Sequence, residues 1–345
     1  MGKKLIIDEV GHSPYDFISQ YVDMESNILV QKNTDEFNIK ALENEQLLGI
    51  ININKLNDIK SLNAFFITVH EKLETDGLFI GLFESKNERK KRLFRKFPPF
   101  INFIYYSFDF LFKRVLAKFS LTKWLVFFIT AGRNKVLPKA EILGRLVFCG
   151  FEIVDDTEFR NVQYFVCRKK NRPHPKNLRP RYGLLFQMNR IGRYGQIIPV
   201  YKLRTMHRYA EYIQDYIYLK NNLEKGGKFK NDYRITEWGH ILRIFWIDEI
   251  PMLYNLIKGD IKLVGVRPIS SHYQELYSKK HNDLRRTYKP GLVPPFYADL
   301  PNTIQEIMES EKRYLLSYSS SPFKTDTRYF FQAIQNILFN HARSS

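Results

Sequence analysis

The stretch FKNDYRITEWGHILRIFWIDEIPMLYNLIKGDIKLVGVRPIS, residues 229–270, carries the strongest structural signal in the chain. Thr236 stands where a helix N-cap is expected, and apolar residues follow it at the spacing of one helix face. These residues are Trp238, Ile241, Leu242, Phe245 and Trp246. Pro251 then marks the first position of a second helix, which Gly259 ends. The stretch therefore predicts two short helices followed by a strand at residues 261–266.

Two adjacent carboxylates lie between these predicted helices. Asp248 and Glu249 would stand at the start of the second helix, where the exposed N–H groups and the dipole should keep a carboxylate ionised. An ionised carboxylate is a nucleophile toward phosphorus and a ligand for Mg²⁺. An isolated pair would most often only cap a helix, but the guanidinium groups of Arg234, Arg243 and Arg267 flank this one. Carboxylates among fixed cations predict a site that binds a diphosphate.

The composition of the 345-residue chain is that of a globular protein with room for two domains. Its 54 Lys and Arg residues against 36 Asp and Glu residues give a net charge of +18, which favours polyanionic partners. The two cysteines, Cys149 and Cys167, are too few for a disulfide framework and fit a reducing compartment. We expect no secretory signal and no membrane-spanning helix, because no apolar run reaches about 18 residues.

A basic, proline-containing stretch separates the two halves of the chain. Residues 161–208 contain no acidic residue, and three prolines fall within residues 173–180. Because such prolines interrupt regular structure, we expect a domain at residues 1–170, a linker at 171–182 and a second domain at 183–345.

The first half alternates strand-like and helix-like segments, which predicts an α/β layer architecture. The expected strands are residues 47–53, 77–83 (after a turn at Asp76-Gly77), 151–154 and 163–167, and the expected helices are 62–73 and 140–149. The stretches LETDGLFIGLFE and CGFEIVDD…QYFVCRKK resemble the later elements of a class I methyltransferase domain over about residues 20–170. A glycine-rich turn after the first strand is missing, so we expect no S-adenosylmethionine binding and interpret this domain as a scaffold or a partner surface. A plain α/β domain unrelated to methyltransferases is the alternative.

An aromatic segment with basic flanks, FPPFINFIYYSFDFLF, occupies residues 97–112. Aromatic residues mixed with aliphatic ones are typical of a segment that lies in the headgroup zone of a membrane. A helix buried between the two domains fits the same composition. Residues 121–130 and 329–339 are further candidates for membrane attachment.

The second half, about residues 182–344, resembles the bacterial sugar transferase family, the monotopic polyprenyl-phosphate phosphoglycosyl transferases. The resemblance is carried by NRIGRYGQIIPVYKLRTM (189–206), by the stretch quoted above with its IKLVGVRP, and by YKPGLVPPF. It implies a mainly helical α+β catalytic domain. It also implies transfer of a phosphosugar from a UDP-sugar to membrane polyprenyl phosphate, with release of UMP, at the cytoplasmic face of the inner membrane.

The same resemblance assigns roles to individual residues. It implies that Asp248 is the nucleophile that forms a covalent phosphosugar intermediate, and that Glu249, together with Asp248, holds Mg²⁺. The basic residues at matching positions would bind the phosphates of donor or acceptor; they are Lys202, Arg204, Arg243 and Arg267. A homo-oligomer or downstream glycosyltransferases are left open as partners.

Two other classes of function compete with this hypothesis. A nucleic-acid-binding protein would use the basic stretch, but no recognition motif accompanies it, so we expect no nucleic acid partner. A catalytically silent membrane scaffold would keep its activity in the cell after replacement of Asp248 by asparagine.

Overall fold

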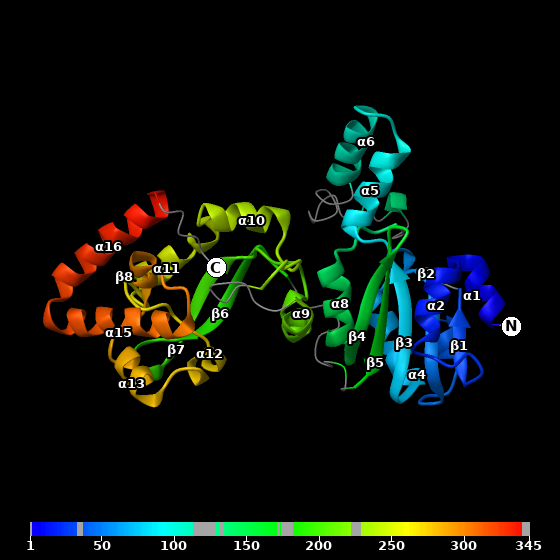
Figure 1. Cartoon of the computed structure of the whole chain (residues 1–345), viewed down its shortest axis with the longest axis horizontal. Coiled ribbons are helices and arrows are strands. Elements are labelled where there is room, and N and C mark those ends of the chain that lie inside the picture. The colour runs from blue at the N-terminus through cyan, green and yellow to red at the C-terminus, as the bar shows by residue number, and fades with distance from the viewer. Residues whose placement is uncertain are drawn as a thin grey trace. The chain divides into compact units, whose positions relative to one another are not determined.

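The computed structural model divides the chain into two compact units, which are considered separately (Figure 1). Unit 1 comprises Met1–Pro180 and Arg208–Tyr216, and unit 2 comprises Arg181–His207 and Ile217–Ser345. The structure describes residues 2–32, 37–112, 124, 128–130, 134–170, 173, 182–221 and 229–339. The expected linker, residues 171–182, therefore lies outside the described residues except at Pro173 and Tyr182.

Unit 1 is built on a five-stranded mixed sheet of order β1-β2-β3-β5-β4. Its strands are β1 (Ile28–Gln31), β2 (Leu47–Lys55), β3 (Leu73–Phe83), β4 (Phe151–Phe159) and β5 (Val162–Lys169). β1, β2 and β3 run parallel to one another, and β5 runs antiparallel to both β3 and β4. The helices are α1 (Gly2–Val10), α2 (His12–Ser19), α3 (Phe37–Lys40), α4 (Leu62–Lys72), α5 (Lys86–Lys96), α6 (Ile101–Phe110) and α8 (Lys139–Phe148). The predicted α/β architecture is confirmed, and the relationship to methyltransferases stays a prediction.

Two details of this sheet differ from the sequence-based expectation. β3 begins at Leu73 rather than after a turn at Asp76-Gly77, and Asp76 adopts a φ of 63° within the strand as its pairing with β2 shifts register. The β4–β5 turn is also tighter than expected. Only Arg160 and Asn161 connect the strands, with φ of 46° and 66°. Positive φ at both positions matches the two-residue turn that best fits the twist of a hairpin.

The core of unit 1 is aromatic and encloses both cysteines. Phe79 packs its ring against Phe65, Phe66, Phe151 and Phe165. Cys149, which follows α8, and Cys167, on β5, are fully buried and unpaired. Burial raises the pKa of the Cys149 thiol to about 12 and raises the pKa of Cys167 as well. Both thiols are therefore core groups.

The aromatic segment forms α6, and its apolar side chains face solvent. Phe100, Phe103 and Phe108 are 86%, 65% and 69% exposed, whereas Asp109 is buried. Within unit 1 this segment is therefore not buried, and its burial between the two domains stays a prediction. Of the related candidate at residues 121–130, only Trp124 and residues 128–130 are described, and most of that segment lies outside the described residues.

Unit 2 surrounds two small sheets with short helices. β6 (Leu185–Ile191) and β7 (Ile197–Leu203) form an antiparallel hairpin, and β8 (Lys262–Val264) pairs in parallel with β9 (Gly291–Val293). The helices are α10 (Glu237–Ile244), α11 (Met252–Lys258), α12 (Ser271–Glu275), α13 (Lys279–Thr287), α14 (Phe296–Asp299), α15 (Ile304–Ser320) and α16 (Pro322–Phe339). One more helix, α9 (Gln214–Asn221), begins in unit 1 and ends in unit 2. None of the helices in the described ranges is long and apolar enough to cross a membrane.

The core of unit 2 combines apolar packing with a buried charged cluster. Val264, Val266, Val293, Tyr297, Tyr314 and Leu315 form its apolar centre together with Tyr329 and Ala333 of α16. Beside it, Glu311 of α15 accepts hydrogen bonds from His281 and Arg285 of α13, and all three are buried. Arg285 also donates to the backbone carbonyl of Arg267 at 2.5 Å. The cluster thus fixes the loop after β8, which carries one of the predicted site arginines.

Candidate active site

Helix α10 is locked against the backbone that follows β7. The N-cap Thr236 accepts a hydrogen bond from the Gly239 N–H at 2.8 Å, and its own N–H and hydroxyl donate to the Thr205 carbonyl at 2.9 and 3.0 Å. A Cβ at Gly239 would lie 2.0 Å from that same carbonyl oxygen. The predicted N-cap is confirmed, and the absence of a side chain at Gly239 lets α10 sit directly on this backbone.

The Asp248-Glu249 pair lies on a 3₁₀ turn, Ile247–Glu249, between α10 and α11. The turn is preceded by Trp246 in the left-handed conformation, with φ of 58°, and the Trp246 ring packs on Tyr297 with centroids 4.4 Å apart. The pair was expected at the start of the second helix, directly before Pro251, but it lies on a separate turn and α11 begins only at Met252. Pro251 and Gly259 delimit α11 as expected, with Pro251 one position earlier, at the N-cap.

Glu249 is held by a lysine from the neighbouring hairpin. The Lys202 ammonium on β7 lies 2.5 Å from Glu249 Oε1, and both side chains are largely buried. Burial lowers the pKa of Lys202, while the Glu249 carboxylate acts in the opposite direction. Lys202 thus holds one oxygen of Glu249, the carboxylate for which the family resemblance implies a role in binding Mg²⁺.

Asp248 is 5% exposed, and its Oδ1 has no hydrogen-bond partner among the described residues. Burial raises the pKa of Asp248, and the neighbouring Glu249 carboxylate adds to this, while the charges of Lys202 and Arg243 lower it. This net direction is opposite to the one expected from a helix start. The physical reason is that the side chain has left water, and the position on a short 3₁₀ turn does not compensate.

Of the four arginines singled out from the sequence, Arg243 and Arg267 lie at this site. Arg243 donates a hydrogen bond from Nε to Thr205 Oγ1 at 3.0 Å. Burial lowers the pKa of Arg243, and the nearby Asp248 carboxylate raises it. Arg267 lines an open cleft with about 390 Å³ of empty space together with Lys202 and Glu249. Other lining residues include Met188, Arg190, Met252, Pro268, Gly291 and Tyr297. The structure therefore gathers Lys202, Arg243 and Arg267 around the acidic pair.

The other two arginines have different partners. Arg234 forms a bidentate ion pair with Asp232, at 2.9 and 2.8 Å, and is buried. Arg204 donates to the Gly183 carbonyl at 3.0 Å, and its guanidinium lies 4.9 and 5.0 Å from the ring centroids of Tyr182 and Phe186. Arg204, like Arg243 and Asp248, is absent from the cleft lining formed by the described residues. The phosphate-binding roles of the four basic residues stay predictions.

Sequence reasoning missed Arg190 as a site residue. Arg190 lies on β6 opposite Ile198, and Lys202 lies on β7 opposite Phe186, so the hairpin places both cations on one face. Burial lowers the pKa of Arg190, with the Arg267 charge as the second cause. The sequence does alternate basic and apolar residues along these two strands. That pattern identifies Arg190 as a neighbour of Lys202 only once the pairing register of β6 and β7 is known.

The acidic pair fits a divalent cation that also contacts a substrate. Within the described ranges, no group of three or more His, Cys, Asp or Glu side chains could hold a metal ion. Mg²⁺ is commonly bound by one or two carboxylates plus substrate phosphates, with water completing the shell. Asp248, with an unpartnered buried oxygen, and the adjacent Glu249 meet that requirement.

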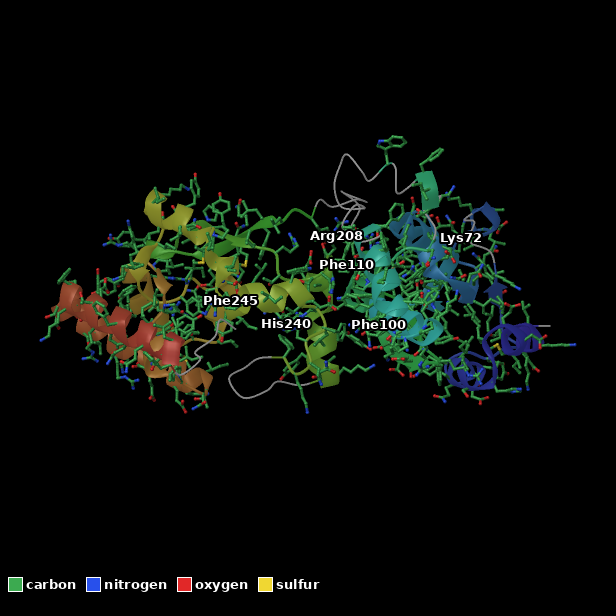
Figure 2. All side chains as sticks on the ribbon, turned by 90° about the horizontal axis from the view of Figure 1, so that it is seen from above. Lys72, Phe100, Phe110, Arg208, His240 and Phe245 are labelled. Carbon is green, nitrogen blue, oxygen red and sulfur yellow. The ribbon has the colours of Figure 1, made fainter. Side chains whose placement is uncertain are left out.

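The exposed side of α10 and α11 is apolar next to this site. On α10 and just after it, Trp238 and Phe245 are 64% and 68% exposed, and on α11 Ile257 is 86% exposed (Figure 2 labels Phe245). Ile241, Ile244, Ile250, Leu253 and Tyr254 are also exposed. The predicted apolar face of the first helix therefore forms, but much of it does not pack into the core.

Comparison with known proteins assigns this part of the chain to a family. The sequence pattern of the bacterial sugar transferases matches residues 177–340. The galactosyl transferase CpsE of Streptococcus agalactiae is 36% identical over 39% of this chain and 31% of its own length. The undecaprenyl-phosphate galactose phosphotransferase of Salmonella typhimurium is 38% identical over 32% of this chain and 24% of its own.

A third relative, the UDP-glucose:undecaprenyl-phosphate glucose-1-phosphate transferase of Caulobacter vibrioides, is 34% identical over 32% of this chain and 38% of its own length. The chain thus spans between about a quarter and two fifths of the length of these three curated relatives. The part of the chain that contains the acidic pair, residues 177–340, belongs to the bacterial sugar transferase family.

Proposed function

We propose that unit 2 transfers a phosphosugar from a UDP-sugar to polyprenyl phosphate, giving polyprenyl diphosphate sugar and UMP. Relatives named as undecaprenyl-phosphate galactose and glucose-1-phosphate transferases support this reaction class. The single observation that carries the proposal is the buried Asp248, whose Oδ1 has no partner among the described residues, beside Lys202 and Arg243.

The reaction takes place in two displacements at one phosphorus atom. An Asp248 carboxylate oxygen attacks the β-phosphorus of the UDP-sugar, the bond to the bridging oxygen breaks, and UMP leaves with that oxygen. A phosphate oxygen of the polyprenyl phosphate then attacks the same phosphorus and displaces the Asp248 carboxylate. Both steps conserve atoms and electrons, and the sugar stays attached to its phosphate throughout.

The cations of the site make the first attack feasible despite repulsion between anions. Arg190 and Arg267 line the cleft where phosphate oxygens would lie, and a guanidinium can bind two of them at once. Arg243 acts on Asp248 itself, and Lys202 holds Glu249 in place. Mg²⁺, held by Glu249 and Asp248 together with the donor diphosphate, would supply further neutralisation of charge on the phosphates.

The acceptor chemistry agrees with the surface beside the site. A polyprenyl phosphate is held in a bilayer, and the exposed apolar residues of α10 and α11 offer a surface that can enter the headgroup region. We therefore propose that unit 2 acts at a membrane surface, at the cytoplasmic face of the inner membrane where UDP-sugars are made. A nucleic-acid-binding role and a silent scaffold are not favoured, since neither accounts for the buried acidic pair.

The test is UMP release by the purified full chain with undecaprenyl phosphate, Mg²⁺ and a panel of UDP-sugars. We expect one UDP-sugar to support turnover and the Asp248→Asn variant to lose at least about 10³-fold in rate, as enzymes lose when a covalent nucleophile is removed. The Asp283→Asn variant is a matched control, because Asp283 is exposed on α13 and does not line the cleft. Absence of UMP release across a broad panel with folded protein would contradict the proposal.

A further inference from the structure

Helices α5 and α6 of unit 1 form a hairpin with an exposed apolar outer face. Ile101, Ile104 and Leu111 are between 49% and 56% exposed, in addition to the three phenylalanines described above. Figure 2 labels Phe100 and Phe110 near the two ends of α6. The ten described residues of α6 span about 15 Å, half of a bilayer core of about 30 Å.

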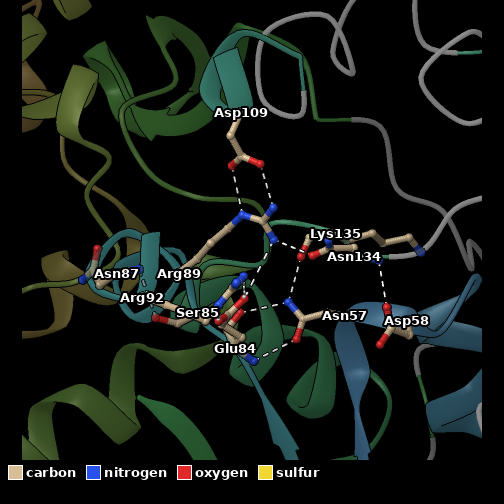
Figure 3. A network of polar contacts seen from close by, with 10 residues as sticks. All are labelled: Asn57, Asp58, Glu84, Ser85, Asn87, Arg89, Arg92, Asp109, Asn134 and Lys135. Atoms are coloured by element: carbon tan, nitrogen blue, oxygen red, sulfur yellow. Dashed lines mark hydrogen bonds and ion pairs between the residues drawn. The ribbon is translucent and has the colours of Figure 1, made fainter. Parts of the chain in front are cut away.

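A buried ion pair joins the two helices of the hairpin to each other. Arg89 of α5 donates from Nε and Nη2 to the two carboxylate oxygens of Asp109 at 2.9 and 2.6 Å, and both residues are buried (Figure 3). This contact explains the acidic residue within an otherwise aromatic helix. It also orients α6, because Asp109 must face α5 while the phenylalanines on the other side face outward.

A second set of contacts joins the hairpin to the ends of two strands. Arg92 pairs with Glu84, which directly follows β3, at 2.5 and 3.0 Å. The Glu84 N–H donates to Asn57 Oδ1 at 2.8 Å, and Asn57 Nδ2 donates to the Glu84 and Lys135 carbonyls (Figure 3). These contacts anchor the hairpin to the rest of unit 1 and fix the orientation of its exposed face within that unit.

Ring contacts close the inner side of the hairpin. The Phe94 and Tyr106 rings lie 5.6 Å apart and the Phe97 and Tyr105 rings 4.6 Å apart. The Lys90 ammonium lies within 6 Å of the Phe94 and Tyr106 ring centroids. Only the outer row of α6, which includes Phe103, Ile104 and Phe108, is left for an external partner.

The exposed charges beside this row are positive. Lys90, Lys91, Arg95 and Lys96 of α5 are exposed, whereas Glu88, the one acidic residue of that helix, is buried. Arg95 and Lys96 form no ion pair within the described part of the chain. Aromatic rings next to unneutralised cations match the two zones of an anionic bilayer surface, the glycerol region and the headgroup phosphates.

We propose that the outer face of the α5–α6 hairpin is a membrane-docking surface that binds anionic phospholipid, separate from the apolar surface of unit 2. A second copy of the chain is a poorer occupant, because it would bring the same cations against each other. A protein interface is also less favoured, since lysine is depleted in such interfaces. This inference goes beyond the proposed function and does not depend on it.

The experiment places an environment-sensitive NBD fluorophore on the full-length Ser107→Cys variant. Ser107 is exposed on α6, and the two native cysteines are buried, so the label reports from the hairpin alone. With vesicles of phosphatidylglycerol we expect a blue-shifted, brighter emission that lipid-borne doxyl groups quench, and with pure phosphatidylcholine a much weaker change. The Ser13→Cys variant, labelled on exposed α2, is the matched control and should stay in an aqueous environment.

Charge reversal supplies the second arm. Arg95→Glu with Lys96→Glu should weaken vesicle binding reported by the Ser107 label at least about thirtyfold, since each basic residue near an anionic surface contributes about fivefold. Lys4→Glu with Lys60→Glu, at exposed positions elsewhere in unit 1, should change it little.

The outcomes separate this inference from the proposed function. A label that stays aqueous with every vesicle while UMP release continues overturns the docking surface alone. A label that is already shielded in buffer, more so as protein concentration rises, shows that a second copy covers the hairpin and also overturns it. Insertion of the label without any UMP release supports the docking surface and contradicts the transferase proposal.

Discussion

The proposed reaction depends on Asp248, and the properties that suit this residue to it follow from burial. A carboxylate that hydrogen-bonds fully to its surroundings would be a poor nucleophile, whereas Asp248 keeps one buried oxygen without a partner in the described ranges. Lys202 and Arg243 supply the compensating charge. Sites arranged for chemistry in this way commonly cost folding stability.

The Asp248→Asn variant should therefore be more stable than the wild type at pH 7. The pKa of Asp248 in the folded protein is raised above its unfolded value of about 3.9. The contribution of Asp248 to the free energy of unfolding is therefore fully favourable only below about pH 3.9. It is lost as the pH rises through the pKa of the folded state. The gain of the asparagine variant should shrink as pH falls toward 4. Thermal unfolding in EDTA between pH 4 and pH 8 checks this, and a variant less stable than wild type at pH 7 would contradict it.

Lys202 should matter more than Arg204. The Lys202→Met variant leaves the Glu249 carboxylate buried without its cation, and we expect about a 10²-fold loss of kcat. Arg204→Gln removes a cation that lies over Tyr182 and Phe186, so its loss should be clearly smaller. Steady-state UMP release measures the loss of kcat in both variants. An equal or larger loss for Arg204→Gln would contradict the assignment of Lys202, rather than Arg204, to the catalytic cleft.

At the scale of elements, the sequence predicted the parts of the site better than their junction. The N-cap Thr236, the terminal Gly259 and the strand after it follow from local rules, and the structure has them. The 3₁₀ turn does not follow from such rules. It depends on Trp246 adopting a positive φ while its ring packs on Tyr297, 51 residues later, and single-sequence patterns do not contain that contact.

Helix α10 should tolerate no side chain at its contact with Thr205. The Gly239→Ala variant places a Cβ against the Thr205 carbonyl oxygen, so the helix must shift, at a cost of about 1–3 kcal/mol in unfolding free energy. UMP release should fall as well, because α10 leads directly into the turn that carries Asp248. The neighbouring His240 is exposed, and His240→Ala should stay within about 0.5 kcal/mol of wild type in urea unfolding.

The buried charged cluster should be the most sensitive polar feature of unit 2. Glu311→Gln leaves the Arg285 guanidinium buried without a countercharge, which typically costs about 3–5 kcal/mol. Glu309→Gln, two residues earlier on the exposed side of α15, is the control and should unfold like the wild type. Chemical unfolding followed by tryptophan fluorescence compares them, since Trp238 and Trp246 both lie in unit 2. Equal stability of the two variants would show that Glu311 is not a structural anchor.

At the scale of the whole molecule, the division into two units differs from the expected one at one segment. Residues 208–216, far beyond the proline-containing stretch, belong to unit 1. The reason is specific: the Tyr209 hydroxyl accepts a hydrogen bond from Asn63 at 2.8 Å, and Gly144 of α8 leaves room for the Tyr209 backbone. Prolines and charge runs mark where a chain leaves a domain, but they do not show where it returns.

The two native thiols provide a check on the integrity of unit 1. Both are buried and have raised pKa values, so neither should react with a thiol reagent such as DTNB at pH 8 in the native protein. Two thiols should react after unfolding in guanidinium chloride. A thiol that reacts at once in the native protein would contradict the core as described.

The most direct test of the central claim is intact-protein mass spectrometry after incubation with the accepted UDP-sugar and Mg²⁺ in the absence of polyprenyl phosphate. The account predicts a mass increase equal to one sugar phosphate on the wild-type chain, mapped by peptide analysis to Asp248, with one UMP released per adduct. Addition of polyprenyl phosphate should discharge it. UMP release only when the acceptor is present, with no adduct on the wild type, or an adduct on another residue, would contradict the assignment of Asp248 as the nucleophile.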